Sequence, residues 1–241
     1  MSESTNRNSV VWLPEKSAQL YQVQGWGSDY FAVSDTGHVV VKPDPRHELP
    51  IDLYELVGDL TMRGRLDELR EANRWLACLP HPFKIAIAGN HDFCFEEEPE
   101  EARRILTAAI YLQDDAVEVG GLRFWGSPWQ PWFYDWAFNL KRGPALAEKW
   151  ALIPEGLDVL VTHGPPAGIL DKTDDGRAVG CEDLMRRVQV VKPRLHVFGH
   201  IHEGRGALWR GDTLFVNASV SEGQEQPMAL DWPPQPPILP R

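Results

Sequence analysis

Short apolar runs alternate with amphipathic stretches along most of this chain. Between residues 65 and 79, apolar residues recur every three or four positions, the spacing of a helix that packs against a sheet on one side. Further helices are predicted over 100–109, 145–152 and 182–190. Runs rich in β-branched and aromatic residues predict strands over 31–35, 54–59, 84–89, 117–119, 122–125, 159–162, 195–198 and 213–216.

Strands and helices that follow one another in this way predict α/β layering. The closely spaced runs near 116–126 and 207–216 add antiparallel hairpins to it. We therefore expect a mixed α/β fold, in which mixed sheets are flanked by helices.

The two ends differ from the middle of the chain. We expect a polar N-terminal extension over 1–28, a folded domain over 29–222 and a proline-rich C-terminal tail over 223–241. The tail is expected to run as polyproline II or as disordered chain. It could bind an SH3-like partner, although an unpacked end is the simpler interpretation.

Composition excludes several classes of protein. The chain has 241 residues and is 43% hydrophobic, enough for a sizeable core. Its net charge of −11 argues against binding of long nucleic acid by a basic surface. No apolar run approaches the roughly 18 residues of a membrane span. Three cysteines without CxxC spacing, and a polar start without a signal peptide, favour a reduced, cytoplasmic protein.

Five of the apolar runs end directly in residue types that bind metal ions. These endings are Asp35, Gly58-Asp59, Gly89-Asn90-His91-Asp92, Thr162-His163-Gly164 and Gly199-His200-Ile201-His202. Loops at the carboxyl ends of strands converge on one crevice, so we expect these side chains to meet. Carboxylate and imidazole ligands together suit Mn²⁺, Fe or Zn²⁺. One such ending is ordinary turn chemistry, whereas five in order predict a metal site.

The donor set is large enough for two ions. One carboxylate can bridge two metals about 3.5–4 Å apart, the spacing that clamps the attacking and leaving oxygens in phosphoryl transfer. On an extended segment His200 and His202 share a face, so each could serve one of two adjacent ions. Two cations would also let an acidic protein receive a small phosphorylated substrate.

The fragments GD (58–59), GNHD (89–92), THGPP (162–166) and GHIHEG (199–204) resemble the motifs of calcineurin-like metallophosphoesterases. Together with the block GSPWQPWFYDWAFN (126–139), they are similar to the metallophosphoesterase-domain-containing (MPPED-like) branch. The resemblance implies a four-layer αββα sandwich, two mixed β-sheets with helices outside. It also implies a dinuclear phosphoesterase, which we expect to be a phosphodiesterase on small or cyclic nucleotides with a metal-bridging hydroxide as nucleophile.

The resemblance also assigns roles to residues. It implies that Asp59 bridges the two ions, that Asn90, His163 and His200 complete one site, and that Asp35 and His202 belong to the other. It implies that His91 acts on the phosphoryl oxygens or the leaving group, and that Asp92 orients His91. A histidine held by a carboxylate is a tuned acid or charge stabiliser, which agrees with this role.

The first motif departs from the family pattern Asp-x-His. The sequence reads Asp35-Thr36-Gly37-His38, so glycine stands where the resemblance places a histidine ligand. Gly37 could let the backbone shift so that His38 reaches the ion, although a slip of one residue reverses a side chain's face on a strand. Otherwise the first ion is held weakly, or activity is largely lost. The stretch from Val39 to Leu53 is interpreted as a solvated loop.

Four tryptophans fall within residues 125–136. Aromatic side chains stack on nucleobases, but packing as a hydrophobic cap is the simpler interpretation. We expect a lid that also shapes the substrate site, with Asn90, His91 and Trp129 as substrate-binding residues. Cys94 is expected to be a buried filler. The alternatives to a phosphodiesterase are a nucleotide- or metal-binding regulatory protein, and a nuclease or phosphomonoesterase.

Overall fold

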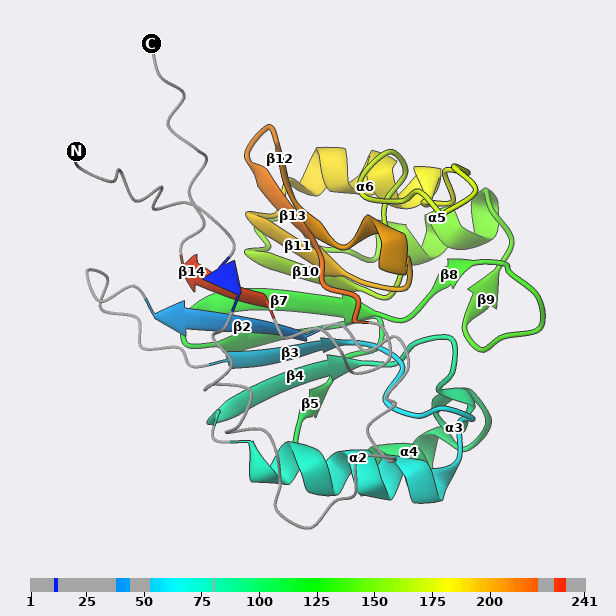
Figure 1. Cartoon of the computed structure of the whole chain (residues 1–241), viewed down its shortest axis with the longest axis vertical. Helices are drawn as coiled ribbons and strands as arrows, with labels where there is room; N and C mark the ends of the chain where they lie inside the picture. Colours follow the sequence, from blue (N-terminus) through cyan, green and yellow to red (C-terminus); the bar gives the residue numbers. More distant parts are fainter. Residues whose placement is uncertain (1–10, 13–37, 44–52, 80, 221–227, 233–241) are drawn as a thin grey trace.

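Two six-stranded β-sheets lie face to face between two layers of helices in a computed structural model of the chain (Figure 1). The structure describes residues 11–12, 38–43, 53–79, 81–220 and 228–232. This arrangement confirms the mixed α/β class and the four-layer αββα sandwich.

The first sheet combines segments from both ends of the chain. Its strand order is β1 (Val11–Trp12), β14 (Met228–Trp232), β2 (His38–Pro43), β3 (Leu53–Val57), β4 (Phe83–Ile87) and β5 (Ile110–Tyr111). Strands β3, β4 and β5 run parallel, whereas β2 is antiparallel to β3. Because of this, the start of β2 and the ends of β3 and β4 lie at the same edge of the sheet.

The second sheet has a parallel centre and antiparallel edges. Its order is β12 (Gly206–Arg210), β13 (Thr213–Asn217), β11 (Leu195–Phe198), β10 (Val159–Thr162), β7 (Leu122–Ser127) and β6 (Asp115–Val119). The edge pairs β6–β7 and β12–β13 are the two predicted hairpins. A small ribbon of β8 (Gln130–Pro131) and β9 (Asn139–Leu140) follows β7.

The helices cover the outer faces of the two sheets. The first sheet carries α2 (Leu66–Cys78), α3 (Phe93–Glu97) and α4 (Pro99–Ile105), and the second carries α5 (Pro144–Ala151) and α6 (Glu182–Val191) (Figure 1). Successive side chains of a strand point to opposite faces of the sheet. Ile85 and Ile87 of β4 therefore pack between the two sheets, and Ala86 faces the helices. In β10, Val159 and Val161 likewise point inward and Leu160 outward.

Two expectations about the chain ends need correction. The segment Met228–Trp232 of the proline-rich tail is a strand that pairs in parallel with β2, not polyproline II or disordered chain. It lacks proline, so every residue in it can donate to the sheet. The stretch after His38, expected to be a loop, begins as β2. The predicted strand 31–35, and with it Asp35, lies outside the described residues.

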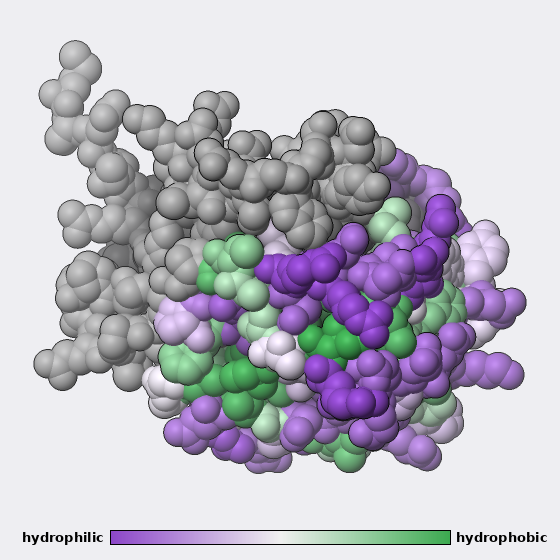
Figure 2. Space-filling model, turned by 90° about the horizontal axis from the view of Figure 1, so that it is seen from below, coloured by the Kyte–Doolittle hydropathy of each residue, from purple (hydrophilic) through white to green (hydrophobic). Residues whose placement is uncertain are grey.

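The surface is broken into small areas of opposite character. On the face drawn in Figure 2, hydrophobic side chains form patches that hydrophilic ones surround. No helix within the described ranges is long and apolar enough to cross a membrane.

Candidate metal centre

The predicted ligands gather where β3, β4, β10 and β11 end, and two glycines let their loops approach closely. A Cβ added to Gly89 would lie 2.2 Å from Oδ1 of Asp59 and 2.6 Å from Cε1 of His163. A Cβ on Gly58 would lie 2.5 Å from Nδ1 of His163. Only glycine therefore fits between the strand ends of the two sheets at these positions.

Three side chains from three loops meet at this point. Asn90 Oδ1 lies 2.7 Å from Nε2 of His163, and Asp59 Oδ2 lies 3.6 Å from the same nitrogen. Asp59 and His163 are fully buried, and Asn90 is almost so. Asp59 adopts a φ of 55°, a left-handed backbone that turns its carboxylate into the group directly after Gly58. The structure thus brings together three of the predicted ligands.

The remaining predicted ligands are placed less closely. The ring of His200 packs 4.8 Å from that of His163, and His200 adopts a φ of 70°. His202 opens a short 3-10 turn (η2, His202–Gly204), so it does not lie on the extended segment expected for it. His38 is the first residue of β2, opposite Leu56, at the sheet edge where Asp59 follows β3.

The predicted ligands that the structure describes do not by themselves form a complete metal cage. Within the described ranges, no group of three or more His, Cys, Asp or Glu side chains is arranged to hold an ion. Of the three side chains that converge, Asp59 supplies a carboxylate, His163 an imidazole and Asn90 a neutral amide. A carboxylate, an amide oxygen and an imidazole nitrogen are nevertheless donors that suit Mn²⁺, Fe or Zn²⁺, so these residues fit a divalent ion by their chemistry.

His91 sits beside this group with its ring fixed by the backbone. Its Nδ1 lies 2.9 Å from the carbonyl oxygen of Met62, and its backbone N–H donates to Oδ1 of Asp59 over 2.9 Å. A carbonyl only accepts, so Nδ1 carries a proton and Nε2 points to the opposite side of the ring. Trp136 packs against the ring at a centroid distance of 4.5 Å.

Asp92 binds the backbone of two loops and the Thr61 side chain. Its fully buried carboxylate accepts hydrogen bonds from the backbone of Leu60, Thr61 and Gly89 and from the Thr61 hydroxyl. Burial raises the pKa of the Asp92 carboxyl, while these four donors favour its ionised form. Asp92 therefore fastens the loop after β3 to the loop after β4. The contact that orients His91 is a backbone carbonyl, which no side-chain motif signals.

Two tryptophans of the block differ in their contacts. Trp129 donates its indole N–H to Asp114 over 2.9 Å, and the Lys149 ammonium lies 4.3 Å from its ring centroid. Trp136 contacts the ring of His91. Cys94 is buried as expected, and burial raises the pKa of its thiol to about 12.

A sequence model of the calcineurin-like phosphoesterases matches residues 32–204, the range that contains all of these loops. The chain belongs to this family. It is 46% identical over 224 residues to metallophosphoesterase domain-containing protein 1 of Homo sapiens, covering 83% of this chain and 68% of the relative. The mouse protein of the same name matches equally well. These relatives place the chain in the metallophosphoesterase-domain-containing branch.

Solved structures agree on the fold. Phosphopantetheinyl hydrolase (PptH) of Mycobacterium tuberculosis superposes with a TM-score of 0.53 at 14% identity, covering 87% of this chain and all of that one. The protein TT1561 of Thermus thermophilus superposes with a TM-score of 0.50 at 13% identity, covering 76% of this chain and 88% of that one. Calcineurin-like phosphoesterases use divalent metal ions, so the chain is a metal-dependent phosphoesterase by family.

Proposed function

We propose that this phosphoesterase is a dinuclear phosphodiesterase that acts on small nucleotide-type esters. The observation that supports this most directly is the convergence of Asp59, Asn90 and His163 beside an oriented His91. Three donors at one point can hold cations, and an imidazole next to them can act on the ester that those cations receive.

The metal ligands in this proposal come from both sheets. Asp59 lies centrally and would bridge the two ions, with Asn90, His163 and His200 on one side. Asp35 and His202 would serve the other side. We expect Mn²⁺, with Fe or Zn²⁺ as alternatives. When bound, the ions would supply the nucleophilic hydroxide by lowering the pKa of water, and they would offset the −11 charge near the phosphate.

His91 acts on the ester itself. Because Met62 holds the proton of Nδ1, the protonated ring presents its second N–H at Nε2, opposite the carbonyl. That N–H would donate to a phosphoryl oxygen, or pass its proton to the leaving-group oxygen. Contact with Trp136 limits how far the ring can rotate, so the proton is delivered in one direction.

Metal content and hydrolysis of a phosphodiester by the wild-type protein in Mn²⁺ test the proposal together. We expect about two ions per chain and turnover of the diester. His91→Ala should lose roughly 10²- to 10⁴-fold in turnover, the usual contribution of a general acid, while it keeps its metal. His91→Gln is the matched variant that retains polarity without a transferable proton. Wild-type turnover in both variants would show that the assigned site is wrong.

Asp59→Asn tests the bridging role separately. An amide keeps the shape of the carboxylate and removes its charge, so we expect loss of both ions. Because Asp59 also accepts the His91 N–H, unfolding should be monitored by circular dichroism in parallel. A folded variant with two ions per chain would disprove the bridge.

The glycine in the first motif favours a second candidate function, a regulatory protein that binds a nucleotide or metal with impaired turnover. The start of β2 places His38 at the edge of the sheet that carries the site. Gly37→His distinguishes the two functions. A marked rise in rate and in metal content would indicate that the natural chain lacks a ligand. If the wild type turns over the diester and the variant has the same rate and metal content, the residues of the natural chain are enough to bind the first ion.

A further inference from the structure

A largely apolar recess lies at Trp136, the residue whose ring contacts His91. Its volume is about 510 Å³, and it is lined by Phe93, Phe133, Tyr134, Asp135 and Trp136. We refer to these residues as the aromatic recess. Volumes of this order are typical of sites for small molecules. Two of its aromatic side chains are unusually open to solvent, since Tyr134 is 66% exposed and Phe133 is 49% exposed.

The loop that carries the aromatic recess is held in place by its backbone. The Asn139 side chain donates to the carbonyl of Tyr134 over 2.8 Å and accepts the N–H of Phe133 over 3.3 Å. The loop is also joined to the metal centre, because Ala137 N–H donates to the carbonyl of Asn90 over 3.1 Å. Backbone that is already held in this way does not need to be ordered when a ligand binds.

Trp136 links the aromatic recess to His91. The Trp136 ring contacts the His91 ring at 4.5 Å and lies 6.3 Å from the Phe93 ring. An ester whose phosphorus lies at His91 therefore has the aromatic recess beside it. Aromatic faces attract planar rings by stacking, and a nucleobase offers such a ring at a short distance from its phosphate.

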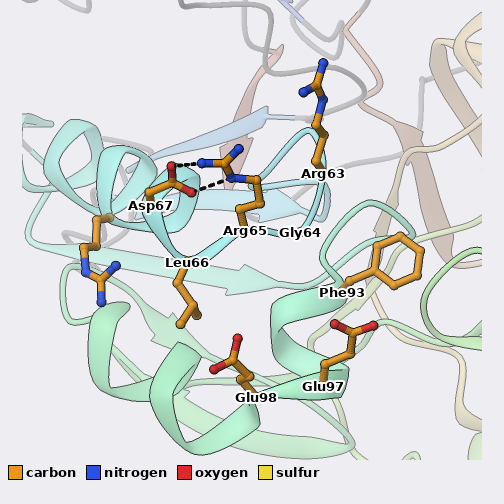
Figure 3. A pocket seen from close by; sticks show the side chains of 9 residues that line it. Arg63, Gly64, Arg65, Leu66, Asp67, Phe93, Glu97 and Glu98 are labelled. Carbon is orange, nitrogen blue, oxygen red and sulfur yellow. Dashed lines mark hydrogen bonds and ion pairs between the residues drawn. The ribbon is translucent and has the colours of Figure 1, made fainter.

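A second hollow on the other side of Phe93 has the opposite character. It measures about 670 Å³, and Figure 3 shows that charged side chains of both signs surround it. Arg65 and Asp67 form an ion pair there, with Nε to Oδ1 at 2.8 Å. A planar apolar ring would displace hydration from these charges without replacing it. Of the two hollows, the aromatic recess is the one that suits a base.

We propose that the aromatic recess binds the nucleobase of the ester whose phosphate reaches the metal centre. This inference rests on the proposed function for the position of the phosphate. It assigns substrate selection to Phe133 and Tyr134, two exposed side chains that line the recess.

The test compares a cyclic nucleotide with the ribose cyclic phosphate that lacks the base. The wild type should favour the nucleotide in kcat/KM, and Tyr134→Ala and Phe133→Ala should each lower this preference about 5- to 100-fold, the loss expected for one stacked base. Both side chains are exposed, so neither variant should unfold. Phe83→Ala is the matched control, since Phe83 is 40% exposed at the opposite end of β4, and it should leave the preference unchanged.

Binding measurements separate this inference from the proposed function. Calorimetric titration of the metal-loaded protein with a nucleoside monophosphate and with ribose phosphate should show the same preference without turnover. Binding of the nucleotide without hydrolysis of either ester would support the aromatic recess while the proposed function fails. Equal affinities in the wild type, or equal loss for both ligands in the variants, would overturn the inference. So would stronger binding of an alkyl phosphate, which would assign the recess to an aliphatic chain.

Discussion

Replacing His196 by leucine should make the stability of this protein less sensitive to acid. His196 lies on β11 and is fully buried, with the rings of Phe198 and Phe215 at centroid distances of 5.0 and 5.6 Å. Its Nε2 lies 2.9 Å from the Thr162 hydroxyl, which itself donates to the carbonyl of Gly164. His196 must therefore donate through Nε2, and it is neutral in the folded protein.

Burial lowers the pKa of His196 from 6.5 to about 3. The unfolded chain takes up a proton near the ordinary value, and the folded chain does not. The stability that comes from the neutral ring is thus complete above about pH 6.5 and is lost as the pH falls toward 3. At about pH 5, roughly 1.5 units below the ordinary pKa, the loss is about 2 kcal/mol.

The leucine variant lacks this titration. At about pH 7.5 it should differ from the wild type by no more than about 1 kcal/mol, since it loses one hydrogen bond but adds apolar contact. Between about pH 7.5 and pH 5 the free energy of unfolding of the wild type should fall by roughly 2 kcal/mol more than that of the variant. For a chain of this size, this raises the Tm of the variant relative to the wild type by about 4–8 °C.

Urea or thermal unfolding followed by circular dichroism measures both proteins at the two pH values. Every sample contains the same metal concentration, and the two proteins are compared with each other at each pH, so that pH effects common to both cancel. A wild type and a variant whose stabilities fall in parallel with pH would refute the reasoning. That result would mean that His196 either accepts a proton while folded or is open to water.

Three further predictions each concern the surroundings of one or two residues. Asp92→Asn should lower the free energy of unfolding by about 2–6 kcal/mol, measured in urea, because the new amide nitrogen leaves two buried donors without an acceptor. A change below about 0.5 kcal/mol would show that Asp92 does not hold the two loops together. Gly89→Ala should lower the metal content and reduce the free energy of unfolding by about 1–3 kcal/mol, since the added Cβ would lie 2.2 Å from Oδ1 of Asp59. Unchanged metal binding would show that the loops move apart freely. Alkylation followed by mass spectrometry should modify the exposed Cys78 and spare Cys94, whose thiol pKa is raised to about 12; rapid labelling of Cys94 would mean that the helix side of the site opens.

Much of the fold follows from local patterns in the sequence. The helix predicted over 65–79 is α2, and the strands predicted at 84–89, 159–162 and 195–198 are β4, β10 and β11 within a residue or two at each end. These elements have clear periodicity or long apolar runs. The strands β2 and β14 were not predicted. β2 contains the run Val39-Val40-Val41, which favours a strand, whereas β14 pairs with β2 from a position far away in the sequence and has no comparable run.

The candidate site divides in the same way. The residue types that follow each strand indicate a metal centre, because parallel strands deliver their carboxyl ends to one edge. The meeting of Asp59, Asn90 and His163 is consistent with that prediction. The sequence did not predict that Asp92 binds the backbone of two loops or that Trp129 donates to Asp114, because a motif does not specify which group a side chain touches.

The sequence by itself determines the order of strands and helices, the ligand types at the strand ends and the glycines that allow tight turns there. Those features depend on residues close together along the chain. Only the tertiary structure decides that Met62 orients His91, that Asp92 joins two loops, and that Trp136 reaches the site. These contacts join residues about 30 or more positions apart, so they depend on which strands become neighbours and on which backbone groups that arrangement brings into reach.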